Sequence, residues 1–176
     1  MSDVVIVSAA RTPVGSFNGS FSGMTAADLG SIAIKEAVNR AKIKTSDVSQ
    51  VIMGQVLTAS CGQNPARQAS ISAGIPNEIT ALTINQVCGS GIRSIALGLE
   101  SIMNNESEIV VAGGQENMSQ APHCFHLRQS GIMGDTKMID SMIKDGIWDI
   151  FNGYHMGVTA ENVAEKWQIT RDQQDE

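Results

Sequence analysis

The segment "NQVCGSG", residues 85–91, contains the residue with the best-defined potential chemistry in this chain, Cys88. The short apolar run "ALTINQV" (81–87) precedes this cysteine, and a helical pattern begins directly after it. The N-terminus of a helix carries partial positive charge and free N–H groups, which stabilise an anionic sulfur and can hold a developing oxyanion. Gly89 and Gly91 remove side chains beside the sulfur, so a substrate can approach it closely. This position favours a nucleophile, and a buried structural cysteine is the alternative.

Three other segments contain residues that could do chemistry. "HCFH" (123–126) holds two histidines and a cysteine, but it lacks the usual ligand spacing and no further ligand cluster appears, so we expect no metal site. "GYHMG" (153–157) holds His155, which on residue type alone is a structural or surface histidine. "GGQENMSQAP" (113–122) is glycine-rich but lacks the GxxxxGK[ST] spacing of a phosphate loop, and we expect it to shape the backbone near the site.

Composition excludes several classes of protein. The 176 residues are enough for one domain with a real core, or for one domain and part of another. A net charge of −6 without a Lys/Arg run argues against nucleic acid as the main partner. Three cysteines at unrelated spacings indicate neither a disulfide framework nor a zinc site, so we expect a reducing compartment. We also expect no signal peptide and no membrane span, and therefore a cytoplasmic protein.

Apolar runs alternate with helical patterns over residues 1–114. Strands are predicted at 4–10, 50–57, 81–87 and 108–114, and helices at 26–41, 65–73 and directly after Cys88. This alternation predicts an α/β fold with a mostly parallel sheet covered by helices. Cys88 then lies at the carboxyl end of a strand, where open α/β sheets bind ligands. Ile92, Ile95 and Leu99 form an apolar stripe on the helix that follows.

Two capping patterns and a proline mark where helices begin. Thr25 with Asp28 forms a capping box, and Asn64 precedes a proline at the first helical position. After residue 114 the chain is polar and irregular, with helices expected around 136–145 and 159–168. Thr170 with Gln173 opens a further helix only a few residues before the end. Because so short a helix cannot stand alone, we expect a longer polypeptide, and a frayed polar tail is the alternative.

Five segments in succession resemble the motifs of the thiolases, and most closely those of the short-chain acetyl-CoA acetyltransferase branch. They are "VVIVSAARTPVGSFNGSF", "GQNPARQA", "NQVCGSG", "VVAGGQENMSQAP" and "NGYHMGVTAENVAE". The resemblance runs over essentially all 176 residues, but it covers a little under half of a full-length thiolase pattern. It implies the thiolase fold, with residues 1–118 in one of its two repeated halves and residues 119–176 at the start of its loop domain.

The resemblance also implies a reaction and its residues. Cys88 would attack a thioester and carry the acyl group, in a reversible Claisen condensation of two acetyl-CoA to acetoacetyl-CoA and CoA. In the loop domain, His155 would lie near the pantetheine arm of CoA, Met156 would line the acyl pocket, and Ile147 matches a CoA-contacting position. The resemblance implies no metal and no bound prosthetic group, because CoA enters as part of the substrate. A full-length relative would be a homodimer or homotetramer.

Three further catalytic groups of the family lie in motifs that this sequence does not contain: a histidine of Gly-His-Pro, a cysteine of Cys-x-Gly-Gly, and an asparagine. We therefore expect this chain by itself to form the acyl-enzyme slowly or not at all. Two alternatives stay open, namely a degradative 3-ketoacyl-CoA thiolase for longer chains and a non-catalytic half that serves as an assembly partner or is a broken gene product. "SAARTPVG" and "GGQENMS" argue against a ketoacyl synthase.

Overall fold

The computed structural model describes residues 3–126, 128 and 133–176. The chain divides into two compact units, Met1–Pro122 and His123–Glu176, and each is described by itself. The sequence pattern set the start of the second segment at residue 119. The roles assigned to the two segments stay predictions.

The first unit contains a parallel sheet of three strands, β1 (Gln50–Gly54), β2 (Thr80–Ile84) and β3 (Val110–Gly114). Their order is β2-β1-β3, and Gly54 pairs in register with Ile84 on one side and with Gly114 on the other. The carboxyl ends of all three strands therefore lie at one edge of the sheet.

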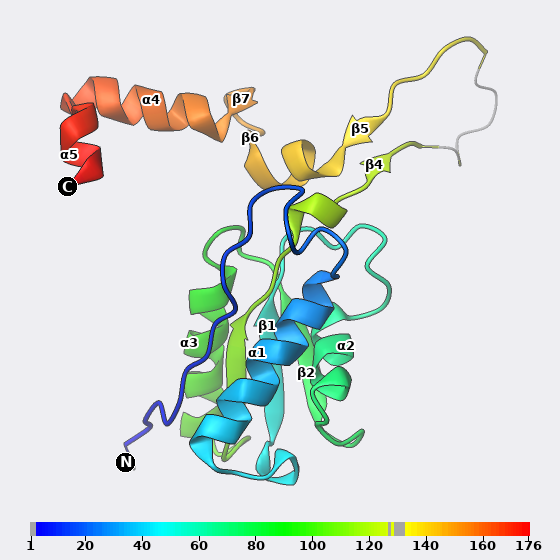
Figure 1. Ribbon diagram of the computed structural model, residues 1–176, viewed down its shortest axis with the longest axis vertical. Coiled ribbons are helices and arrows are strands. Elements are labelled where there is room, and N and C mark those ends of the chain that lie inside the picture. The colour runs from blue at the N-terminus through cyan, green and yellow to red at the C-terminus, as the bar shows by residue number, and fades with distance from the viewer. Residues whose placement is uncertain (1–2, 127, 129–132) are drawn as a thin grey trace. The chain divides into compact units, whose positions relative to one another are not determined.

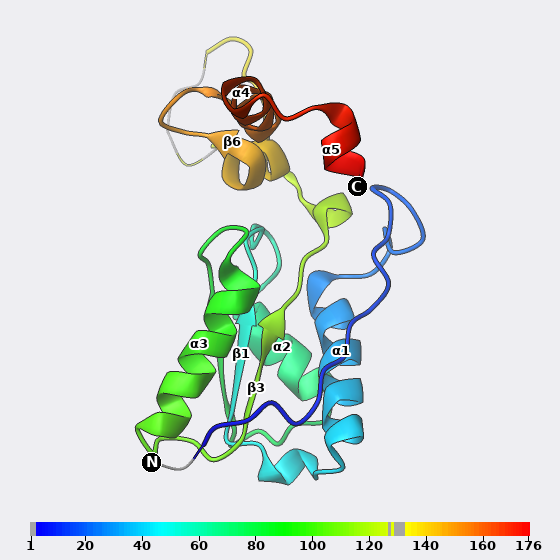
Figure 2. The ribbon, with the colours of Figure 1, turned by 90° about the vertical axis from the view of Figure 1, so that its left-hand side faces the viewer.

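Helices cover both faces of this sheet (Figures 1 and 2). α1 (Ala26–Ala41) and α2 (Pro65–Ser72) lie on one face, and α3 (Ser90–Met103) lies on the other. Short 3₁₀ turns occupy Thr45–Asp47 and Met118–Gln120. The arrangement confirms the predicted α/β class with a parallel sheet covered by helices.

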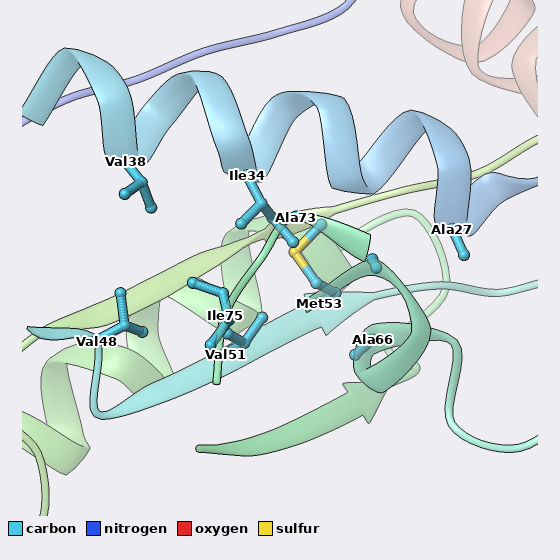
Figure 3. Close-up of a cluster of buried hydrophobic side chains, with 10 residues drawn as sticks. Ala27, Ile34, Val38, Val48, Val51, Met53, Ala66, Ala73 and Ile75 are labelled. Atoms are coloured by element: carbon cyan, nitrogen blue, oxygen red, sulfur yellow. The ribbon is translucent and has the colours of Figure 1, made fainter. Parts of the chain in front are cut away.

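The apolar core fills the space between the sheet and the pair α1 and α2 (Figure 3). Ile34 and Val38 of α1 point toward Val51 and Met53 of β1, and all four are buried. Complete burial of such a side chain contributes about 1.5–3 kcal/mol. The remaining buried members of this cluster are Ala27, Val48, Ala66, Ala69, Ala73 and Ile75.

The face of α3 that packs on the sheet is made of small residues. Ser90, Ser94, Gly98 and Ser101 are buried, whereas Ile92 of the apolar stripe is 70% exposed. Glycine at 98 permits this close packing, because a Cβ there would lie 3.1 Å from a methyl carbon of Val110. The apolar stripe is therefore on the side of α3 that faces away from this sheet.

The strand predicted at residues 4–10 is wrong. These residues belong to no strand, and Val5, Ile6 and Val7 are exposed. Their recorded hydrogen bonds go to α1: the Ser8 hydroxyl donates to the Ala37 carbonyl, and the Arg40 guanidinium donates to the Ala9 carbonyl. β-branched composition favours an extended backbone, but it does not supply the neighbouring strand that a sheet requires.

Over its described residues, the second unit holds two short antiparallel pairs and two helices. β4 (His123–Cys124) pairs with β5 (Ile139–Asp140), and β6 (Trp148–Asp149) pairs with β7 (Tyr154–His155). A π-helical turn spans Met142–Ile147, and the helices are α4 (Met156–Trp167) and α5 (Arg171–Asp175).

The helix expected around 136–145 is thus replaced by β5 and the π-helical turn, while the helix expected around 159–168 is α4. In polar segments of this kind the local preferences for a helix and for an irregular turn differ little in free energy. Tertiary contacts therefore decide which of the two forms. Among the described residues, no helix is both long and apolar enough to cross a membrane.

Candidate active site

Cys88 is exposed and lies on the turn that joins β2 to α3. Gly89 is the N-cap residue of α3, so the cysteine stands one residue before the cap, at the carboxyl edge of the sheet. The other cysteines, Cys61 and Cys124, are free and half-buried. Of the three thiols, Cys88 is therefore the one most open to a ligand.

The turn uses two of the N–H groups that the sequence suggested for an oxyanion. The Gly89 N–H donates to the Gln86 carbonyl at 3.1 Å, and the Ser90 N–H donates to the Val87 carbonyl at 3.1 Å. These two groups are engaged within the chain, so they cannot serve a ligand unless the turn opens. Sequence reasoning did not anticipate this, because the pairing depends on how tightly the turn folds back.

A buried serine lies inside the same turn. The Ser90 hydroxyl donates to the Val87 carbonyl at 2.6 Å and accepts from the Gln86 N–H at 2.8 Å. The Asn85 side-chain oxygen accepts from the Val87 N–H at 2.9 Å. Two side chains of the "NQVCGSG" motif, one before and one after Cys88, thus satisfy backbone groups of the two residues that precede it.

Glycines allow α3 to begin directly against the ends of β1 and β3. A Cβ on Gly54 would lie 2.5 Å from the Cβ of Ser90, and a Cβ on Gly114 would lie 3.4 Å from the Cα of Gly91. Any larger residue at the first position would collide with the backbone of the helix. The sheet therefore sets where the turn that bears Cys88 can lie.

A half-buried carboxylate joins the loops that follow β1 and β3 at this edge. Glu116 accepts from the Val56 N–H at 2.8 Å and from the Leu57 N–H at 3.3 Å. Burial raises the pKa of the Glu116 carboxyl, and the two backbone hydrogen bonds partly oppose that rise. Beside it, the buried Gln115 amide donates to Gln55 at 2.9 Å. The signal for this cluster in the sequence was a charged residue two positions after the glycines that end β3.

The three residues assigned to CoA lie at the ends of the β6–β7 hairpin strands. Trp148 pairs with His155, while Ile147 directly precedes β6 and Met156 directly follows β7. His155 is exposed and is the N-cap residue of α4, where its Nδ1 accepts from the Gly157 N–H at 2.9 Å. In the neutral imidazole this leaves Nε2 as the N–H donor toward a ligand.

Cys88 belongs to the first unit, and Ile147, His155 and Met156 belong to the second. Across the ranges that the structure describes, no three His, Cys, Asp or Glu side chains gather in a way that could hold a metal ion. The His123 ring of "HCFH" instead lies 3.7 Å from the Asp140 carboxylate on the neighbouring strand.

A parallel sheet between helices, with an exposed cysteine where a strand passes into a helix, defines an α/β protein with a site suited to a thiol nucleophile. The model of the thiolase N-terminal domain matches residues 4–176, and the chain belongs to the thiolase family.

Similar proteins agree with this family. The chain is 59% identical over 173 residues to an acetyl-CoA acetyltransferase of Rhizobium meliloti, covering 98% of this chain and 44% of the relative. It is also 59% identical over 176 residues to that of Paracoccus denitrificans, covering 100% and 45%. The solved structure of Acat5 thiolase from Ascaris suum in complex with coenzyme A matches with a TM-score of 0.90 and 37% identity, covering 98% of this chain and 45% of that one. The chain therefore spans a little under half the length of these relatives.

Proposed function

We propose that this chain supplies the nucleophile of an acetyl-CoA acetyltransferase, with Cys88 as the acyl carrier. The observation that carries the proposal is the exposed thiol on the turn between β2 and α3, in a chain 59% identical to relatives with that name.

In the first step the Cys88 sulfur attacks the thioester carbonyl of acetyl-CoA. A new carbon–sulfur bond forms to Cys88, the bond to the CoA sulfur breaks, and CoA leaves as the thiol after receiving the proton lost from Cys88. In the second step another acetyl-CoA loses a proton from its methyl group, and the resulting carbanion attacks the acetyl-cysteine carbonyl. A carbon–carbon bond forms, the bond to the Cys88 sulfur breaks, and the proton taken from the methyl group returns to that sulfur, which leaves acetoacetyl-CoA and the free thiol. The covalent intermediate splits one difficult condensation into two easier steps. A thioester also keeps the carbonyl electrophilic for the second attack.

The second unit would contact CoA. His155, Met156 and Ile147 lie in or next to the Trp148–His155 pair that ends the β6–β7 hairpin, and the free Nε2–H of His155 can donate to an acceptor of the pantetheine arm. This assignment comes from the family resemblance. The proposed reaction uses no metal and no bound prosthetic group. The proposed complete enzyme is a cytoplasmic homodimer or homotetramer.

Proton transfer in the full cycle needs groups from outside this sequence. The chain contains no Gly-His-Pro and no Cys-x-Gly-Gly motif, and the resemblance assigns the base and the second acid to those motifs. The direct test is therefore a chimera in which residues 1–176 replace the aligned portion of the Paracoccus denitrificans relative. We expect the chimera to cleave acetoacetyl-CoA with CoA and to carry one acetyl group on the peptide that contains Cys88.

Cys88→Ser in the chimera should abolish both the cleavage and the acetylated peptide. Cys61→Ser is the matched control, because Cys61 is also a free thiol but is half-buried and hydrogen-bonded to Leu57. Acetyl transfer at the parental rate in the Cys88→Ser chimera would contradict the proposal. A marked preference of the chimera for longer 3-ketoacyl-CoA substrates would favour the degradative class.

A further inference from the structure

Val87, the residue before the proposed nucleophile, has a backbone conformation that its side chain disfavours. Its φ is +49°, in the left-handed region, although valine is branched at Cβ. Residues of this kind rarely adopt positive φ, and they do so where the surrounding structure imposes it. Contacts from the surrounding structure must therefore keep Val87 in this backbone conformation.

The side-chain contacts that can do so come from two residues: the Asn85 side-chain oxygen accepts from the Val87 N–H, and Ser90 makes the others. The Ser90 hydroxyl accepts from the N–H of Gln86, the residue before the strained one, and donates to the carbonyl of Val87 itself. Ser90 itself is only 4% exposed, and it is fixed against the end of β1 by its close contact with Gly54. The sheet thus fixes the serine, and the serine fixes the turn.

We propose that Ser90 is a positioning residue for Cys88, whose hydroxyl holds the 85–90 turn in the conformation that presents the sulfur. The inference rests on the proposed role of Cys88 as nucleophile. Without the hydroxyl, the Gln86 N–H loses its acceptor, and the Asn85 side chain and the Ser90 N–H alone hold Val87 in the left-handed region. Cys88, the next residue, then changes direction.

The chain offers a matched control on the same helix. Ser94 is buried as completely as Ser90 and lies one helical turn later, and its hydroxyl donates to the carbonyls of Gly91 and Gly113. Ser94→Ala therefore removes a buried serine hydroxyl that makes no hydrogen bond within the 85–90 turn. A role in packing alone predicts similar effects for the two substitutions, whereas positioning predicts an effect for Ser90→Ala only.

The test follows hydrogen exchange of the Gly89 amide in the 176-residue chain, because this N–H bonds to the Gln86 carbonyl and not to the serine hydroxyl. Ser90→Ala should accelerate this exchange about tenfold or more, and Ser94→Ala by less than about twofold. Asparagine tolerates positive φ far better than valine. Val87→Asn should therefore slow the exchange in the native chain and restore most of the protection in the Ser90→Ala background.

The rate of acetyl transfer in the chimera shows whether the loss of the Ser90 hydroxyl affects the reaction of Cys88. Ser90→Ala should slow acetylation of Cys88 about tenfold, because attack on a thioester needs a directed sulfur. Alkylation of the same exposed thiol by iodoacetamide, which needs no such orientation, should change less than about threefold. Equal effects of Ser90→Ala and Ser94→Ala on exchange, or no recovery with Val87→Asn, would overturn the inference.

If Ser90→Ala does not fold, the Val87→Asn variant decides alone, and unchanged or faster Gly89 exchange in it contradicts the inference. If the parental chimera transfers no acetyl group, the proposed function fails, while Gly89 exchange in the 176-residue chain still decides whether Ser90 holds the turn.

Discussion

Gly54, the last residue of β1, lies against Ser90, the first residue of α3, with no room for a side chain between them. A Cβ on Gly54 would stand 2.5 Å from the Cβ of Ser90 and 2.6 Å from its carbonyl carbon. The carbonyl carbon belongs to the backbone, so a rotamer change cannot move it away. The position of α3, and of the turn that bears Cys88, therefore depends on glycine at residue 54.

Gly54→Ala should destabilise the first unit by about 1–3 kcal/mol, because α3 must move off the sheet to admit the methyl group. Gly113→Ala is the matched control on the adjacent strand, where a Cβ would make only ordinary contacts of 3.6 Å with the Met53 sulfur. Urea unfolding of both variants measures the difference. Equal loss of stability in the two variants would show that the contact between Gly54 and Ser90 can relax.

Local signals in the sequence were sufficient wherever one short segment decides the structure. The Thr25–Asp28 capping box begins α1, and Asn64 caps α2 with its side-chain oxygen accepting from the Arg67 N–H at 3.1 Å. The parallel sheet followed from strands alternating with helices, because such crossovers require it. The expected position of Cys88 between a strand and a helix is confirmed, because both elements are defined by short local patterns, and its role as nucleophile stays a prediction.

Features that depend on distant partners were not predicted. The apolar run at 4–10 has strand composition, yet its recorded hydrogen bonds go to α1. Glu116 accepts from backbone N–H groups about 60 residues away in the sequence. Ser90 bonds within its own turn, but what holds it in place is its close approach to Gly54 on another element. Periodicity describes one face of one helix, and it carries no information about such contacts.

The capping box of α1 should make stability depend on acid pH. The Thr25 hydroxyl and its N–H donate to the Asp28 carboxylate at 2.7 Å and 2.9 Å, and these bonds lower the pKa of Asp28. The folded chain therefore binds this proton more weakly than the unfolded chain. The contribution is present above the ordinary pKa of aspartate and is lost as pH falls through the lowered value.

Thr25→Ala should cost about 1 kcal/mol at neutral pH and should weaken this pH dependence, measured by urea unfolding between neutral and acid pH. Thr170→Ala is the control, because it removes the same kind of capping box from α5, a helix without buried residues. A loss of stability in Thr170→Ala as large as in Thr25→Ala would show that the cap does not act through the packed core.

The contribution of Glu116 to stability should depend on pH in the opposite direction to that of Asp28. Burial raises the pKa of its carboxyl, so the folded chain binds this proton more tightly than the unfolded chain. Stability should therefore fall as pH rises from the ordinary pKa of glutamate through the raised value, and then level off. Glu116→Gln should remove this dependence, because the amide does not titrate, while its oxygen can still accept from the Val56 N–H.

Glu116→Ala should lower the free energy of unfolding more than Glu116→Gln does. The alanine leaves the N–H groups of Val56 and Leu57 without their acceptor, which costs about 1–3 kcal/mol. Unfolding free energies of the three proteins between acid and neutral pH test both statements. A Glu116→Gln protein that keeps the parental pH profile would show that another group titrates.

His155 has two separable roles in the proposed function, as the cap of α4 and as a contact for CoA. Its Nδ1 accepts from the Gly157 N–H, so His155→Ala should fray the first turn of the helix and accelerate exchange of the Gly157 amide. Asparagine is a strong N-cap residue, so His155→Asn should preserve that turn. Only the imidazole Nε2–H, free in the capped geometry, is then lost.

The chimera with the Paracoccus denitrificans relative separates these roles through the KM for CoA in acetoacetyl-CoA cleavage. If Nε2 donates to CoA, His155→Asn should raise this KM about fivefold or more, the loss expected for one hydrogen bond, while exchange of the Gly157 amide stays at the parental rate. His155→Ala should raise the KM for CoA and also accelerate exchange of the Gly157 amide. A parental KM in the His155→Asn chimera would mean that His155 only caps α4, and the contact to CoA would then have to come from elsewhere on the hairpin, with Met156 and Ile147 as the next residues to vary.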